Sequence, residues 1–275
     1  MSRRARIDAE LVRRGLARSR QHAAELIDAG RVSVDGMPAT KPATAVASTA
    51  RLTVAGAERS WVSRGAHKLI GALDAFGITV TGRRCLDAGA STGGFTEVLL
   101  DRGAAAVVAV DVGYGQLAWS LRTDPRVTAV ERTNVRHLAP ADIGAPAELV
   151  VADLSFISLT TVLPALISCA APDADMVPMV KPQFEVGRAQ VGSGVVADPQ
   201  LRAGAVMTVA ECARQLGWHT VGVSASPLPG PSGNVEYFLH LRGAPDRGPS
   251  GGPSGGLSGG ALQNAVRDAV AKGPQ

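Results

Sequence analysis

Four charged residues of this 275-residue sequence have types and positions that could activate a hydroxyl group: Lys68, Asp153, Lys181 and Glu236. Asp153 ends the apolar stretch VVAD and Lys181 ends MVPMVK, where a charged group is unexpected in a strand suited to the core. A lysine can take a proton when burial or a neighbouring cation favours its neutral form. Each residue also has an ordinary interpretation, since strand-end lysines commonly reach solvent and an Asp–Lys pair can be purely structural.

A glycine-rich turn joins a predicted strand to a predicted helix in CLDAGASTGGFTEVL, residues 85–99. A dinucleotide site would have G-x-G-x-x-G directly after the strand, so that a pyrophosphate could approach the backbone. Here Asp87 leads the turn, and its carboxylate would repel a pyrophosphate but would suit a cationic ligand. S-adenosylmethionine, which carries an ammonium and a sulfonium group, is therefore the cofactor that we expect in place of a dinucleotide.

Polar residues also follow the next two strands. Asp111 ends the second strand, where a carboxylate can accept both ribose hydroxyls, and Asn134 follows the third, where it could read the adenine edge. Gly89, Gly93 and Gly94 would let the backbone approach the methionine part of the cofactor. The predicted cofactor-binding residues are Asp87, Gly89, Ala90, Ser91, Gly93, Gly94, Phe95, Asp111, Val112, Asn134 and Asp153.

The elements that position these residues are apolar strands alternating with helical stretches. A helix is predicted over residues 63–78, and strands over residues 83–90, 105–112, 127–133, 147–154, 175–182, 219–226 and 235–242. This order predicts an α/β fold with a doubly wound, mostly parallel, seven-stranded sheet of the Rossmann-like type. Asp153 and Lys181 should then meet at the carboxyl ends of neighbouring strands, beside the cofactor.

Residues 1–59 form a separate α+β unit. RIDAELVRRGLARSRQHAAELIDAGRVSVDG predicts two short helices, the second capped by Ser19 and stopped by Gly30, and then a strand and a turn; RLTVAG is the closing strand. The spacing L-x-x-x-G-x-x-x-S-R followed by A-x-x-L-I-x-x-G-x-V-x-V-D-G resembles the small RNA-binding module (S4-like) of a small-subunit ribosomal protein. Without that pattern, the arginines alone would indicate a solvent-exposed, charged face of a helix. The predicted RNA contacts are Arg3, Arg4, Arg6, Arg18, Arg20, Lys41, Arg64 and Arg188.

A wider resemblance covers nearly all of the chain, to about residue 242. Lys68, Asp153, Lys181 and Glu236 match, in order and element, the K-D-K-E set of the FtsJ-like ribose 2′-O-methyltransferases. The segments WVSRGAHKL, DAGASTGGFTEVLL, DVGYGQL, ADLSFISL, KPQFEVG and GPSGNVEYF resemble the TlyA family, whose members have also been called haemolysins. The Gly/Ser-rich tail is the main departure from the family pattern.

The resemblance implies a class I methyltransferase fold in a bacterial, cytoplasmic enzyme. It implies transfer of a methyl group from S-adenosylmethionine to cytidine 2′-hydroxyls of 16S and 23S ribosomal RNA, with ribosomal subunits as partners. In the family, this modification accompanies susceptibility to capreomycin and viomycin. We expect Lys181 to be the general base and Asp153 to orient it, while Lys68 and Glu236 position the ribose and hold Lys181.

The predicted domains are an RNA-binding domain over residues 1–59, a linker over 60–63, a methyltransferase domain over 64–242 and a flexible tail over 243–275. The tail contains GPSGGPSGGLSGG, which is typical of a linker, and then the short helical pattern ALQNAVRDAVAKG.

Composition narrows the function classes. The net charge of +4 and pI of about 9.3 fit an anionic partner.

Cys85, Cys169 and Cys212 are far apart with no C-x-x-C, so we expect neither a disulfide framework nor a metal site. Residues 154–171 are uncharged but contain Pro164, and we interpret them as a strand end followed by a buried helix rather than a membrane span. No stable membrane association is expected.

Several alternatives remain open from the sequence. The rival functions are a membrane-acting, haemolysin-like protein and an RNA-binding protein without activity; an amino-methyltransferase is disfavoured because DLSF lacks the prolines of D-P-P-Y. Phe156 is either a platform for a base flipped out of its duplex or a core residue. Residues 185–200 form either a mobile lid that contacts RNA or an ordinary surface loop.

Overall fold

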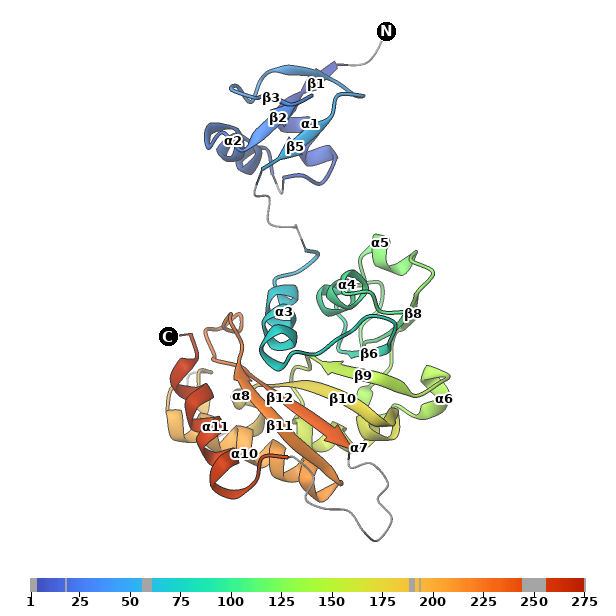
Figure 1. Cartoon of the computed structure of the whole chain (residues 1–275), viewed down its shortest axis with the longest axis vertical. Helices are drawn as coiled ribbons and strands as arrows, with labels where there is room; N and C mark the ends of the chain where they lie inside the picture. Colours follow the sequence, from blue (N-terminus) through green and yellow to red (C-terminus); the bar gives the residue numbers. More distant parts are fainter. Residues whose placement is uncertain are drawn as a thin grey trace. The chain divides into compact units, whose positions relative to one another are not determined.

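The computed structural model describes residues 4–17, 19–55, 61–187, 191–192, 194–243 and 256–274. The chain divides into two compact units, Met1–Trp61 and Val62–Gln275 (Figure 1).

The first unit packs two helices on short strands. Its elements are β1 (Arg4–Arg6), α1 (Ile7–Arg13), α2 (Arg20–Asp28), β2 (Val32–Val34), β3 (Met37–Pro38), β4 (Ala45–Ala47) and β5 (Leu52–Val54). Strand β1 pairs with β4, and β2 lies between β3 and β5. Ile7, Leu11 and Ile27 fill the core. Ser19 caps α2 as predicted, because its Oγ accepts a hydrogen bond from the His22 amide at 3.1 Å.

The second unit is built on a seven-stranded sheet in the order β11-β12-β10-β9-β6-β7-β8. The strands are β6 (Arg84–Ala88), β7 (Ala106–Val110), β8 (Val127–Val130), β9 (Ala147–Ala152), β10 (Ala170–Val180), β11 (Trp218–Ala225) and β12 (Tyr237–Gly243). Strands β8, β7, β6, β9 and β10 run parallel, and β12 pairs antiparallel with β10 and β11. The doubly wound, mostly parallel sheet is confirmed.

Helices cover both faces of this sheet (Figure 1). They are α3 (Gly65–Phe76), α4 (Gly94–Asp101), α5 (Trp119–Arg122), η1 (Val135–His137), α6 (Pro140–Ile143), α7 (Leu159–Ser168), α8 (Pro182–Glu185), α10 (Pro199–Gln215) and α11 (Gly259–Lys272). Helices α3 and α4 pack together, and α10 packs on α7, α8 and α11. The uncharged stretch contains α7, whose Leu159, Val162 and Leu163 are buried in the main core. In the part of the chain that the structure describes, no helix is both long and apolar enough to cross a membrane.

The C-terminal helix packs on the second unit; the sequence indicated a short helix in the tail and left open whether it docks or stays mobile. Helix α11 contacts α10 and β11, and Val266 and Ala269 are buried in the contact. Just before the helix, the Leu257 amide donates a hydrogen bond to the Thr220 carbonyl of β11 at 2.7 Å. The sequence pattern gives the apolar face of α11, which includes Val266 and Ala269, but does not identify α10 and β11 as the surface that covers it.

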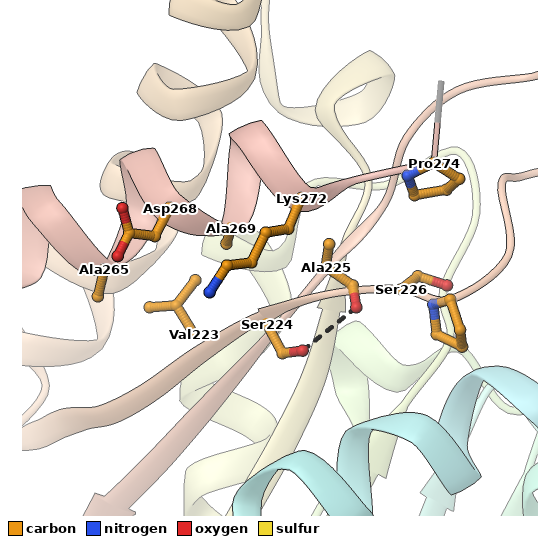
Figure 2. Close-up of a pocket in the computed structure, with 10 residues that line it drawn as sticks. Val223, Ser224, Ala225, Ser226, Ala265, Asp268, Ala269, Lys272 and Pro274 are labelled. Carbon is orange, nitrogen blue, oxygen red and sulfur yellow. Dashed lines mark hydrogen bonds between the residues drawn. The ribbon is translucent and has the colours of Figure 1, made fainter.

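A pocket of about 540 Å³ lies between α11 and β11 (Figure 2). Asp268 and Lys272 of the helix stand over Val223 and Ser224 of the strand. Ser224 Oγ donates to the Ala225 carbonyl at 3.2 Å. This pocket contains none of the four charged residues predicted to be catalytic.

Removal of residues 244–275 is expected to lower the free energy of unfolding by about 2–4 kcal/mol, because burial of one valine contributes ~1.5–3 kcal/mol and α11 also covers apolar groups of its neighbours. Urea denaturation of the full and shortened chains would measure the change. Val266→Asp should reproduce most of the loss, whereas Asn264→Asp, on the exposed face of α11, should not. An unchanged midpoint in the shortened chain would contradict the packing role.

Candidate active site

Two cavities lie side by side at the carboxyl ends of the parallel strands. The first, here called the lysine cavity, has a volume of about 340 Å³ and includes Lys68 and Lys181 in its wall. The second, here called the acidic cavity because Asp111 lines it, has a volume of about 500 Å³. The residues common to both walls are Gly89, Ser91, Asp153 and Ser155. Groups bound in the two cavities would therefore meet at Asp153 and Ser155.

The lysine cavity contains two ion pairs. Lys181 Nζ lies 2.7 Å from Asp153 Oδ1 and donates a hydrogen bond to Ser155 Oγ at 2.9 Å. Lys68 Nζ donates to Glu236 Oε2 at 2.5 Å. Both lysines are 8% exposed and Glu236 is fully buried, so little water screens these charges.

The pairing differs in one respect from the roles expected from the sequence. Asp153 contacts Lys181, since β9 and β10 are neighbouring strands. Glu236 holds Lys68 instead of Lys181, because the first turns of α3 face the start of β12. Each ammonium group is thus paired with its own carboxylate.

Asp87 does not face either cavity, contrary to the expectation that its carboxylate meets the cofactor. The residue is fully buried, and its Oδ2 accepts a hydrogen bond from Thr96 Oγ1 at 2.6 Å. Burial, reinforced by the charges of Asp153 and Asp111, raises the pKa of Asp87 to about 7. The first turn of α4 covers the end of β6, and this tertiary contact turns the carboxylate inward.

The acidic cavity contains the other polar residues that were predicted to bind the cofactor. Asp111 accepts hydrogen bonds from the amides of Ser91 at 2.8 Å and Gly113 at 2.7 Å. Asn134 Oδ1 accepts from the Arg136 amide at 3.0 Å, and Val112 is 70% exposed at the rim. Each Asp111 oxygen retains a lone pair, so the carboxylate can still accept ribose hydroxyls.

The glycine-rich turn fits a ligand that needs close contact with the backbone. Gly89 lines both cavities with φ +88°, and a Cβ at this position would lie 2.4 Å from the Asp153 carbonyl oxygen. Ala90, Ser91, Gly94 and Phe95 continue the wall of the lysine cavity. Gly93 stands behind the turn, where a Cβ would collide with Leu121. The turn lines both cavities with backbone that carries no side chain at Gly89, and Asp111 adds a carboxylate acceptor; both features fit S-adenosylmethionine.

Gly89→Ala is expected to weaken cofactor binding at least about 10-fold, because the turn must move away from Asp153 to accept the methyl group. Calorimetric titration with S-adenosylmethionine would measure the affinity. Gly82→Ala is the matched control: Gly82 has φ +78° with no atom within 4 Å of the added Cβ, so it shares the backbone strain without the collision. Equal affinity in the two variants would contradict the close approach at Gly89.

Ser155 and Phe156, which follow Asp153, belong to the site, although the sequence did not define a place for them there. Ser155 was not predicted, although its position two residues beyond a strand-end carboxylate could have indicated it as a site residue. Phe156 is 91% exposed with φ +64°, so the interpretation as a core residue is wrong. Its ring lies 5.2 Å from that of Phe184, measured between centroids.

The predicted RNA contacts lie in both units. In the first unit, Arg6 and Arg20 both bind Asp8, at 2.8 and 3.0 Å, and their hydrogen bonds hold the pKa of Asp8 well below its usual range. Arg4 and Lys41 are exposed there. In the second unit, Arg64 is exposed and lines the lysine cavity. The remaining predictions fall outside the described residues: Arg3, Arg18 and Arg188.

Metal ligands were not expected, and the described residues contain no group of three or more histidine, cysteine, aspartate or glutamate side chains placed to hold a metal ion.

Both units match known protein families. A family model described as "FtsJ-like methyltransferase" matches residues 61–243, and one described as "S4 domain" matches residues 5–52. The chain is 74% identical over 249 residues to the 16S/23S rRNA (cytidine-2′-O)-methyltransferase TlyA of Mycobacterium tuberculosis, covering 90% of this chain and 93% of that protein.

More distant relatives extend over a similar length. Hemolysin A of Brachyspira hyodysenteriae is 36% identical, with 86% of this chain and 99% of that protein covered. A solved structure from Streptococcus thermophilus, which carries a provisional hemolysin label, is 34% identical with a TM-score of 0.70, and 99% of this chain and 96% of that chain are covered.

Proposed function

Since the chain belongs to the FtsJ-like methyltransferase family, we propose that it methylates the 2′-hydroxyl of cytidines in 16S and 23S ribosomal RNA, with S-adenosylmethionine as methyl donor. The observation that carries the proposal is the ion pair between Lys181, in the wall of the lysine cavity, and Asp153, which lines both cavities. The relative from Mycobacterium tuberculosis, whose name states this reaction, supports the choice of nucleoside and RNA. The enzyme would act in the cytoplasm, where ribosomal subunits are present.

The residues divide the task between the cavities. Asp111 and Asn134 would hold the ribose and adenine of the cofactor in the acidic cavity, and the turn at Gly89 would face its methionine part. When bound, S-adenosylmethionine supplies an electrophilic methyl group. As a neutral amine, Lys181 Nζ would take the proton of the 2′-hydroxyl and become the ammonium that pairs with Asp153, while Asp153 and Ser155 hold that nitrogen in place.

The target ribose would enter the lysine cavity, where Lys68 and Arg64 are available to its hydroxyl and phosphate groups. Phe156 projects its ring outside the core, where it can stack on a base once the target nucleotide leaves its duplex. The S4 domain supplies a second RNA-binding surface, with Arg6 and Arg20 held by Asp8.

The proposal is tested by methyl transfer from labelled S-adenosylmethionine to isolated small and large ribosomal subunits, followed by nuclease digestion and separation of ribose-methylated from base-methylated nucleosides. Label in 2′-O-methylcytidine from both subunits is the expected result. Label on a base would point to a different reaction, and no label on either subunit would contradict the proposal. Leakage of dye from anionic liposomes, measured with the same preparation, would instead favour the membrane-acting alternative.

A further inference from the structure

Two segments that follow neighbouring strands are joined by three contacts in succession: residues 153–159, which connect β9 to α7, and residues 181–185, which contain α8. The first is the ion pair of Lys181 with Asp153. The second is the ring contact of Phe184 with Phe156 at 5.2 Å. The third is formed by Glu185, which lies at the end of α8. The catalytic lysine and the exposed phenylalanine are therefore parts of one packed arrangement.

Glu185 uses both carboxylate oxygens to hold the far end of the first segment. Its Oε2 accepts a hydrogen bond from Ser158 Oγ at 2.6 Å, and its Oε1 accepts from the Leu159 amide at 2.8 Å. Leu159 is the first residue of α7, where an amide has no partner inside the helix. Burial raises the pKa of Glu185, and the two hydrogen bonds oppose that effect.

Phe156 depends on such external support. Its φ of +64° lies in the left-handed region, which is unfavourable for an aromatic residue, and its side chain is 91% exposed. Burial of its own side chain therefore contributes little to this conformation. The segment is instead fixed at its start, by Lys181 through Asp153 and Ser155, and at its end, by Glu185.

We propose that Glu185 is a positioning residue of the RNA site: by binding Ser158 and Leu159 it holds the loop on α8, so that Phe156 is presented to a base of the RNA. The inference rests on the proposed function, because a base platform matters only if the substrate is RNA. Glu185 lines neither cavity, and its effect passes through Phe156.

A double-mutant cycle with Phe156 tests this inference. Methyl transfer to the ribosomal subunits is measured for the unaltered protein, for the single variants Glu185→Ala and Phe156→Ala, and for the double variant. We expect Glu185→Ala to lower kcat/KM about 10- to 100-fold, mainly through a higher KM for the subunits. The affinity for S-adenosylmethionine should change less than the KM for the subunits, although residues 154–157 of the same loop also line the acidic cavity. In the Phe156→Ala background, Glu185→Ala should produce no further loss.

The controls separate positioning from a general helix-capping role. Ser158→Ala removes the hydrogen bond to Glu185 Oε2 together with the cap that Ser158 Oγ forms with the Thr160 amide at 3.1 Å. It should reproduce part of the effect, which keeps the test valid if Glu185→Ala folds poorly. Asp142 accepts a hydrogen bond from the Ala139 amide at the start of α6, so Asp142→Ala removes a comparable contact elsewhere and should leave the KM for subunits unchanged.

Two outcomes would overturn the inference while leaving the proposed function intact: normal kinetics in Glu185→Ala, or losses that multiply in the double variant. An absence of methyl transfer in the unaltered chain would instead remove the proposed function, and the inference with it.

Discussion

Lys181→Ala is expected to slow methyl transfer to ribosomal subunits about 10²- to 10⁴-fold, the range that a positioned general base contributes. The substitution removes the nitrogen that contacts both Asp153 and Ser155. Single-turnover rates with saturating S-adenosylmethionine would isolate the chemical step. Cofactor affinity should stay within about threefold, because Lys181 is absent from the acidic cavity.

Two companion variants make this result specific. Lys181→Met keeps much of the side-chain volume and should be as slow as Lys181→Ala, since it cannot take a proton. Lys272→Ala changes a lysine in the pocket between α11 and β11 and should retain the original rate. Near-normal turnover by Lys181→Ala would rule out this residue as the base.

Glu236→Gln is expected to destabilise the folded state by about 3 kcal/mol, because it leaves the Lys68 ammonium buried without a countercharge. For a unit of this size, the melting temperature should fall by about 6–12 °C. Calorimetric unfolding would measure the change. Methyl transfer should also fall, since Lys68 loses the group that fixes it in the lysine cavity.

The pair can be removed as a unit to separate stability from function. Lys68→Met combined with Glu236→Leu replaces two buried charges by apolar groups, so it should regain most of the stability that Glu236→Gln loses. Methyl transfer should remain low, because neither a cation nor a carboxylate is restored. A double variant as unstable as Glu236→Gln would show that the ion pair is not the cause of the loss.

Residues at strand ends could be located from sequence because a parallel sheet places all its carboxyl ends together. Apolar runs located the strands, and the order of the runs made Asp153 and Lys181 neighbours. The capping role of Ser19 could also be predicted from the sequence, since helix capping depends on residues three positions apart. These inferences need only local pattern and a known sheet order.

The remaining features depend on contacts between distant segments. Glu236 is 168 residues from Lys68 in sequence, and nothing in either segment indicates that it would bind Lys68 rather than Lys181. Asp87 is turned inward by Thr96 on the helix that covers it. Phe156 is exposed because of its backbone conformation, whereas its apolar side chain suggested the core as readily. Periodicity carries no information on such choices.

The hydrogen bond from Leu257 to Thr220 has a consequence for aggregation. Strand β11 is the outermost strand of the sheet, and such an edge, if left open, is a template on which another chain can add a strand. A stop codon or frameshift upstream of Gly256 would therefore do more than shorten the protein. The truncated chains would present an unprotected edge to one another during synthesis and would be prone to accumulate as insoluble assemblies.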